Sequence, residues 1–342
     1  MGVIDHKCLS CGATLPFNPE TQRWDCEYCG ASYSLIDLNE SDNKTQERKQ
    51  KSYELNCYHC PDCGAEVVAD DTTTATFCVY CGNTNIIKNK LKGEFLPSKI
   101  IPFQTTKEQA IEAFKQVKKG KIFAPKAFNS EENIQKITGV YIPFWIYDCD
   151  TDGEVNFDAR KIKSWTMGDY HYTKTDYYII NRSGNMKFDN VPVDGSSKFD
   201  DDTMDSIEPF DYKGLKDFDM SYLSGFLSEN YDVSKEYAAT RMKQRVENTT
   251  INELKSTVGY YNSITIKNAD VKVDIKETEY MLLPVWMLNI KFKDKLYLFA
   301  MNGQTGKMVG NVPVDNGKLA VIWLIAFVIS FIILSLGYFF FS

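Results

Sequence analysis

The pattern of hydrophobic and polar positions divides this chain into stretches of different character. Short apolar segments between cysteines fill most of residues 1–92, and a polar stretch interrupts them. Longer periodic segments follow up to residue 315, and an unbroken apolar run ends the chain. We therefore expect small modules at residues 1–36 and 57–92, a polar linker at residues 37–56, a larger domain at residues 93–315 and a terminal helix at residues 318–342.

Helical periodicity is clearest in the segment TTKEQAIEAFKQVKKG, which begins at Thr105. Thr105 is the expected N-cap, and Glu108 stands where a capping box places its acid. Gly120 would end this helix, because glycine readily adopts the left-handed conformation that follows a helix. The segment SEENIQKITG repeats the pattern, with Ser130 as the expected N-cap and Gly139 as the expected end. The first helix would bury one face, formed by Ala110, Ile111, Phe114 and Val117.

Alternating apolar and polar residues dominate two later regions. Residues 140–193 and residues 264–314 show the period of two that is typical of β-strands. A helical pattern over residues 234–258 separates them. Turns are expected at Asp152-Gly153, Ser183-Gly184, Lys293-Asp294 and Asn302-Gly303. Together these elements predict an α+β domain whose sheet is mainly antiparallel.

The last apolar run has the length of a membrane span. Residues 319–341 contain no charged side chain, and as a helix they would extend about 35 Å at about 1.5 Å per residue. A bilayer core is about 30 Å thick, so the run is long enough to cross it. Lys318 precedes the run, and the first residues of the chain lack the apolar segment of a secretory signal. We therefore expect a single-pass protein of the cell membrane with a cytoplasmic N-terminus, which contacts the lipid bilayer through Leu319 to Phe341.

Eight of the ten cysteines form two sets with the same spacing, C-x2-C-x14-C-x2-C. The second cysteine of each pair is followed by glycine, which suits a tight turn that directs backbone N–H groups toward a thiolate. Four thiolates at this spacing are typical of a closed tetrahedral zinc site that supports folding rather than catalysis. The sequence predicts two zinc ribbons and two Zn²⁺ ions per chain. The expected ligands are Cys8, Cys11, Cys26, Cys29, Cys60, Cys63, Cys78 and Cys81.

Other uses of these cysteines fit the sequence less well. Disulfide bonds require an oxidising compartment, and a thioredoxin-like motif uses one cysteine pair rather than two. Iron in a rubredoxin-like site stays open as an alternative, because a tetrahedron of thiolates suits both metals. Cys57, His59 and His6 break the repeated spacing, so we expect them to stay outside the sites. Cys149, inside the apolar stretch YIPFWIYDC, is expected to be a buried free thiol.

Charge argues against nucleic acid as the partner of the ribbons. The chain carries 39 Lys and Arg against 46 Asp and Glu, which gives a net charge of −7. Residues 1–92 carry nine basic and thirteen acidic side chains. Binding of nucleic acid depends on basic side chains that neutralise phosphates. The ribbon loops instead carry apolar side chains that we expect to be exposed and to bind protein, namely Leu9, Tyr28, Tyr58, Val79 and Tyr80.

An acidic segment runs from Asp194 to Asp211, with seven acids and one lysine. We expect it to be a solvated loop that caps a helix. A divalent-cation site is the alternative, although the spacing differs from that of an EF-hand loop.

Catalytic residues are hard to find in this sequence. The three histidines are His6, His59 and His171, and none of them belongs to a Ser-His-Asp or Cys-His set. Enzyme activity therefore has no support in the sequence, although the sequence does not exclude it.

Several further segments match a known family: APKAF, TGVYIPFW, SSKFDDDTMDSIEPFDY, LPVWML and AMNGQTGKMVG. Together with the ribbons, they make residues 1–315 resemble the TFIIB-type zinc-ribbon-containing proteins of Firmicutes and archaea. The C-terminal apolar run makes the chain similar to the membrane-anchored branch of that family. The resemblance implies a cytosolic protein partner, a phage-shock-protein-A homologue that is held at the membrane in envelope stress.

The expected function is that of a membrane-anchored cytosolic adaptor. Its zinc ribbons and its α+β domain would recruit proteins to the membrane. The alternative is a nucleic-acid-binding zinc-ribbon protein that is tethered to the membrane. The acidic ribbons favour the adaptor, because they would repel phosphates.

Overall fold

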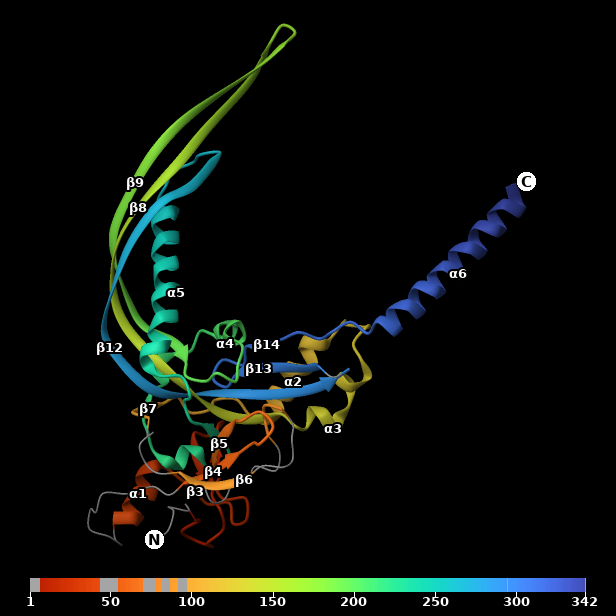
Figure 1. Ribbon diagram of the computed structural model, residues 1–342. Helices are drawn as coiled ribbons and strands as arrows, with labels where there is room; N and C mark the ends of the chain where they lie inside the picture. The colour runs from red at the N-terminus through yellow and green to blue at the C-terminus, as the bar shows by residue number, and fades with distance from the viewer. Residues whose placement is uncertain are drawn as a thin grey trace. The chain divides into compact units, whose positions relative to one another are not determined.

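The computed structural model describes residues 7–43, 55–69, 78–81, 87–91, 97–293 and 295–341 (Figure 1). The chain forms two compact units. Residues 1–142, 198–230 and 282–342 belong to the first unit, and residues 143–197 and 231–281 belong to the second. Both units combine helices with mainly antiparallel strands, so the expected α+β class is confirmed.

The first ribbon, residues 7–43, is a small antiparallel sheet followed by a helix. Its elements are β1 (Phe17–Asn18), β2 (Arg23–Asp25), β3 (Ser32–Tyr33) and α1 (Leu35–Asn43). Its buried side chains include Leu15, Phe17, Trp24 and Leu38. A module of this size buries little apolar surface, so its fold needs a further source of stability.

The second ribbon comprises the described residues between 55 and 91. Its strands are β4 (Leu55–His59), β5 (Glu66–Ala69) and β6 (Ile87–Leu91), and β4 pairs antiparallel with both of the others. Strand β5 also pairs with β11 (Leu227–Glu229), where Ser228 lies opposite Val68. The second ribbon therefore extends the large sheet of the first unit.

The large sheet has the strand order β10-β7-β12-β8-β11-β5-β4-β6. Its remaining strands in the first unit are β7 (Lys99–Ile100), β10 (Lys216–Asp217), β13 (Lys295–Asn302) and β14 (Met308–Gly310). Strands β8 (Thr138–Met167) and β12 (Ser263–Phe292) are long, and each contributes residues to both units. Strand β13 pairs with β12 on one side and with β14 on the other.

Two of the four expected turns lie at the ends of β13. Phe292 pairs with Lys295, so the chain reverses where the turn at Lys293-Asp294 is expected. Asp294 itself lies outside the described residues. At the other end, Oδ1 of Asn302 accepts hydrogen bonds of 2.9 Å from the backbone N–H groups two and three residues later. This second turn is therefore closed by the side chain of its first residue.

Besides α1, the helices of the first unit that precede the terminal one are short. They are α2 (Lys107–Lys118), α3 (Glu131–Ile134) and α4 (Asp201–Ile207), with the 3₁₀ helices η1 (Lys126–Asn129), η2 (Tyr212–Gly214) and η3 (Met220–Leu223). Helix α2 buries Ala110 and Phe114 of the expected face, whereas Ile111 and Val117 are half-buried. Gly120 follows the helix with a φ of +79°, which confirms the expected helix end.

Helix α2 begins one residue later than expected. Thr106, and not Thr105, is its N-cap, and Gln109, and not Glu108, completes the capping box. The hydroxyl of Thr105 instead accepts a hydrogen bond of 3.0 Å from Nε1 of Trp286. The two consecutive threonines make the register ambiguous in the sequence, and this tertiary contact occupies the first of them.

The second expected helix is shorter than predicted. Helix α3 ends at Ile134, and Gly139 belongs to β8 instead of ending a helix. A Cβ atom at position 139 would lie 2.6 Å from the ring of Phe226 and 3.1 Å from that of Phe103. The glycine therefore leaves room for these two rings against β8, and the prediction of a helix end was wrong.

The second unit is built on one long hairpin. Strand β8 pairs antiparallel with β9 (Tyr170–Asp194), and the ladder ends with Met167 opposite Tyr170. Helix α5 (Lys235–Ser256) packs against these strands, as Figure 1 shows. Its buried face consists of Ala238, Met242, Val246, Thr250 and Leu254. The helix expected over residues 234–258 is confirmed.

The turns expected at Asp152-Gly153 and Ser183-Gly184 are absent. Both glycines lie inside the long strands, where Gly153 pairs directly with Gly184. A Cβ atom at Gly153 would lie 2.9 Å from Cγ2 of Thr250 and 3.3 Å from Cδ1 of Leu254. The paired glycines therefore leave room for helix α5 to approach the hairpin closely.

Replacing Gly153 by alanine should destabilise the second unit by about 1 to 3 kcal/mol, because the new methyl group would overlap Thr250. Gly184→Ala is the matched control, since its Cβ atom would lie at an ordinary distance of 3.4 Å from Leu254. Urea denaturation followed by circular dichroism measures both free energies of unfolding. Equal stability of the two variants would contradict the proposed role of Gly153.

The acidic segment is used structurally at its two ends. Asp194 is buried and forms an ion pair with Arg241, with its Oδ1 2.5 Å from Nη1 of the guanidinium. Asp200 is the N-cap of α4, where its carboxylate accepts a hydrogen bond of 3.2 Å from the backbone N–H of Thr203. Asp211 caps η2 in the same way. The expected capping of a helix is confirmed at Asp200. The prediction of a solvated loop was wrong, because residues 201–207 of the segment form helix α4 itself and Asp194 is buried.

Helix α6 (Asn316–Phe341) contains the apolar run. Its segment Asn316–Ile333 has a mean hydropathy of 2.1, and none of that segment is buried within the chain. The helix is long and apolar enough to cross a membrane, as the sequence predicts. The helix begins at Asn316, two residues before the expected boundary at residue 318. The carbonyl of the preceding residue, Asp315, accepts a hydrogen bond from the backbone N–H of Leu319.

Candidate metal centres and an adjoining pocket

The structure brings the eight predicted ligands together in two groups of four. Within each group, the Sγ atoms all lie within 4.8 Å of one another. In the first ribbon, the Sγ atoms of Cys8 and Cys29 are 3.3 Å apart and those of Cys11 and Cys26 are 3.5 Å apart. Both corresponding distances in the second ribbon, Cys60 to Cys81 and Cys63 to Cys78, are 3.6 Å.

These distances fit a single metal ion in each group. A tetrahedral ion with bonds of about 2.3 Å to sulfur separates its ligand atoms by about 3.8 Å, close to the separations observed. All eight thiols are unbridged by disulfides. Each group can therefore hold a metal ion, and four sulfur ligands would leave no coordination position for a substrate.

Backbone hydrogen bonds shape the turns that present these cysteines. In the first ribbon, the N–H of Gly12 donates to the carbonyl of Cys8 at 2.8 Å, and Gly12 has a φ of +75°. The same bond and a positive φ recur at Gly30 and at Gly64. Glycine reaches this conformation without steric cost, which explains its place in each repeat. The fourth such glycine, Gly82, lies outside the described residues.

Hydrogen bonds also favour the thiolate form of the first cysteine in each group. The Tyr33 hydroxyl lies 3.5 Å from Sγ of Cys8, and this contact lowers the pKa of Cys8 to about 5. Burial alone would raise the pKa of Cys60, but the backbone N–H groups of Cys63 and Asp62 outweigh it and lower that pKa. A thiolate is the form of cysteine that binds metal ions.

The neighbouring candidate ligands remain outside the groups. His59 lies near Glu66, with 3.8 Å between Nδ1 and a carboxylate oxygen, and it belongs to neither cysteine group. The backbone of Cys57 pairs with Val68 in the sheet, and the predictions for the Cys57 side chain and for His6 lie outside what the structure describes. Cys149 is buried, as expected, and burial raises its pKa to about 11.

The first ribbon packs against η3 of the same unit through aromatic side chains. Phe17 and Trp24 of the ribbon contact Tyr222, with ring centroids 5.4 Å and 5.3 Å away. Nε1 of Trp24 donates to the carbonyl of Ser221 at 3.0 Å, and the hydroxyl of Ser224 donates to the carbonyl of Leu15 at 2.8 Å. These buried contacts join parts of the chain that are about 200 residues apart, and no local pattern in the sequence predicts them.

The second ribbon is held at its last cysteine pair. The side-chain amide of Asn289, on β12, donates to the carbonyls of Val79 and Tyr80. The ring of Tyr80 packs against Phe199, with centroids 5.2 Å apart. Its cysteine turn is therefore fixed to the domain by hydrogen bonds as well as by sheet pairing.

Three of the five loop side chains that we expected to be exposed are buried. Tyr58, Val79 and Tyr80 pack inside the first unit with at most 7% of their surface exposed. Leu9 and Tyr28 are exposed, by 54% and 86%. The prediction failed at the second ribbon because its loops pack against the α+β domain. The sequence does not show how the ribbon and that domain are packed together.

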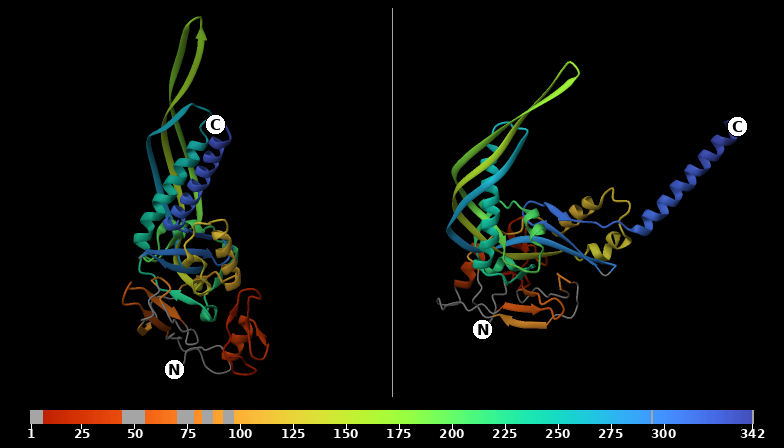
Figure 2. Two further views of the ribbon diagram at one scale, coloured as in Figure 1. Left: turned by 90° about the vertical axis from the view of Figure 1, so that its right-hand side faces the viewer. Right: turned by 45° about the horizontal axis from the view of Figure 1, so that its top comes forward.

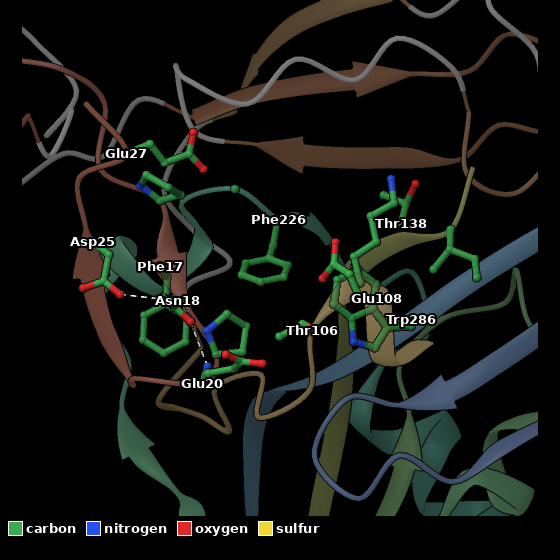
Figure 3. Close-up of a pocket in the computed structure, with 16 residues that line it drawn as sticks. Phe17, Asn18, Glu20, Asp25, Glu27, Thr106, Glu108, Thr138, Phe226 and Trp286 are labelled. Carbon is green, nitrogen blue, oxygen red and sulfur yellow. Dashed lines mark hydrogen bonds between the residues drawn. The ribbon is translucent and has the colours of Figure 1, made fainter. Parts of the chain in front are cut away.

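A cavity of about 520 Å³ lies beside the first ribbon (Figure 3). Both the ribbon and the domain line it, with the buried aromatic rings of Phe17, Phe226 and Trp286. Its lining also includes four carboxylates against one lysine. These charged residues are Glu20, Asp25, Glu27, Glu108 and Lys107.

One of these carboxylates is held by the ribbon itself. Asn18 and Thr21 each donate a hydrogen bond of 2.8 Å to Oδ2 of Asp25. Burial alone would raise the pKa of Asp25, but hydrogen bonds from Ser32, Thr21 and Asn18 lower it. The pocket therefore keeps this negative charge at neutral pH, and it suits a positively charged group next to an apolar one.

Comparison with known proteins finds a relative that matches nearly the whole chain. No family model matches the chain, and no solved structure matches it. The uncharacterized protein YdjG of Bacillus subtilis (strain 168) is 34% identical over 318 residues, which cover 93% of this chain and 92% of YdjG. The chain therefore belongs to the same family as YdjG.

Proposed function

We propose that this protein is a membrane-anchored cytosolic adaptor that holds a partner protein at the membrane. The observation that carries the proposal is the pocket between the first ribbon and the domain, with its aromatic floor and acidic rim. Helix α6 would be the anchor, with the ribbons and both units on the cytoplasmic side. Two closed cysteine groups and no recognised catalytic set among the described residues favour a binding role over a catalytic one.

Zinc is the metal that we propose for both groups. Sulfur is a preferred ligand of zinc, and a four-cysteine site is a common structural zinc site. Zinc would fix the turn that carries Asp25 and Glu27, and thereby one wall of the pocket. Iron could occupy the same tetrahedron, and metal analysis separates the two.

The partner segment that fits the pocket carries basic and apolar side chains. Arginine or lysine at the rim would meet ionised carboxylates, while an apolar neighbour would pack on the aromatic rings. Nucleic acid does not fit this description, because its phosphates would face the same carboxylates. A phage-shock-protein-A homologue is the candidate partner that the family resemblance implies.

Charge reversal in the pocket should weaken capture of the partner at least about tenfold, because two favourable charges become repulsive. The test variant is Glu20→Lys with Glu108→Lys, and both side chains are exposed on the pocket rim. The matched control is Glu112→Lys, which lies on the same helix outside the pocket lining. The measurement is affinity purification of the tagged chain from solubilised membranes, with quantification of the phage-shock-protein-A homologue after nuclease treatment.

The comparison of variants decides the outcome. The adaptor proposal expects capture by the wild-type chain and by Glu112→Lys, and its loss in the double variant. Capture that disappears with nuclease would favour the nucleic-acid alternative. Equal capture by all three chains would show that the pocket does not bind the partner, and would contradict the proposal.

A further inference from the structure

The end of the β8–β9 hairpin carries an apolar face that the second unit does not cover. The last two ladder pairs on this face are Trp165 opposite Tyr172 and Met167 opposite Tyr170. All four side chains are exposed, Met167 by 65% and Tyr170 by 72%. The rings of Trp165 and Tyr172 stack, with centroids 5.6 Å apart and 12° between their planes. We define these four residues as the hairpin tip.

The tip continues the same face that helix α5 covers farther down the hairpin. Directly opposed residues of an antiparallel ladder share a face, and so does every second pair along it. Val155, Phe157 and Ala159 on this face are buried in a cluster that includes Leu254 of α5. The ladder extends from Ala159 to Met167 beyond this cover, or about 26 Å at about 3.3 Å per residue. Figure 2 shows the hairpin reaching past α5 and β12 in both views.

Basic side chains lie between the covered part and the tip. Lys163 pairs directly with Lys174, and both are exposed. Lys174 is also 3.0 Å from Asp176, and Lys161 lies over the ring of Tyr261 at 4.8 Å. Like charges directly opposite each other destabilise a ladder. Asp176 offsets the charge of Lys174, and an anionic surface would offset that of Lys163.

We propose that the hairpin tip inserts into the interfacial layer of an anionic lipid bilayer. Tryptophan and tyrosine favour the boundary between headgroups and acyl chains, and lysines behind them meet anionic headgroups. A second copy of the chain is a poorer fit, because a symmetric contact would bring the same lysines together. The inference rests on the proposed anchoring by α6, which would keep the chain at the bilayer.

The test uses the full chain in vesicles and the fluorescence of Trp165. The signal of Trp165 is the emission of the wild-type chain minus that of Trp165→Phe, because the chain has five tryptophans. Bromine atoms on acyl chains quench tryptophans that reach them. Vesicles of phosphatidylcholine alone are compared with vesicles that also contain phosphatidylglycerol, each with and without brominated lipid. Flotation of every variant with vesicles reports anchoring by α6 separately.

In anionic brominated vesicles, the Trp165 signal should fall at least about twofold, and in neutral ones it should hardly change. Lys163→Glu with Lys174→Glu should abolish the quenching while the chain still floats and keeps its circular dichroism spectrum. Quenching that ignores lipid charge, or no quenching of Trp165 in a chain that floats, would overturn the proposal. A lipid-independent blue shift of Trp165 would indicate that protein covers the tip, and would overturn it too.

Discussion

Cys60→Ser should remove one of the two zinc ions that we propose and unfold the end of the large sheet. Binding of a structural zinc ion contributes about 10 to 16 kcal/mol to a small module of this kind, and three sulfur ligands cannot keep the closed site. Strand β4 pairs with β5 and β6 of the same ribbon, and β5 pairs onward with β11. The loss should therefore spread from the ribbon to the neighbouring strand. Metal analysis and hydrogen exchange of β11 measure the two effects.

Two further substitutions bracket this prediction. Cys8→Ser should also leave one zinc ion, but its damage should centre on the first ribbon and on its contact with Tyr222. Cys149→Ser should keep both zinc ions, since this thiol is buried away from the two groups. A wild-type chain with one zinc ion, or a red protein that contains iron, would contradict the zinc assignment.

Truncation after Asp315 should move the chain almost entirely from the membrane fraction to the soluble fraction. The removed helix exposes an apolar surface along the whole of Asn316–Ile333, and that surface has no cover within the chain. Burial of such a segment in a bilayer is favourable for nearly every residue. Fractionation at high salt measures the change, because salt weakens electrostatic binding at the surface but leaves the anchor intact.

A matched control keeps the rest of the chain constant. Replacing residues 316–341 by an unrelated membrane-spanning helix should restore the membrane fraction. If the truncated chain still pellets with membranes at high salt, α6 is not the principal anchor. At low salt, the hairpin tip could retain a weaker association, which the salt series separates from anchoring.

The cysteine groups were predictable because their geometry is local. A C-x2-C pair brings two sulfur atoms together within one turn, and the repeated glycine supplies the conformation that the turn requires. Within each group, the two pairs then meet across 14 intervening residues. The apolar run of α6 is predictable for a similar reason, since length and composition alone decide whether a helix can span a bilayer.

Two paired glycines and the second ribbon could not be predicted correctly, because contacts between distant parts of the chain determine their structure. Gly153 and Gly184 lie in segments that are typical of turns. The space at Gly153 is instead set by Thr250 on helix α5, about 100 residues farther along the chain. Tyr80 was expected at an exposed loop and is buried because Asn289 and Phe199 hold that loop. The pocket has the same origin, because its walls come from the first ribbon and from residues far along the chain. Its acidic lining could have been found only by knowing which segments meet.

The most direct test of the adaptor account is the location of the partner when the anchor is removed. Cells that make the full chain, or residues 1–315 alone, are fractionated, and the phage-shock-protein-A homologue is quantified in the membrane and in the cytosol. The account predicts that the partner moves into the cytosol together with the truncated chain and co-purifies with it there. A partner that stays at the membrane while the truncated chain is soluble would contradict the account.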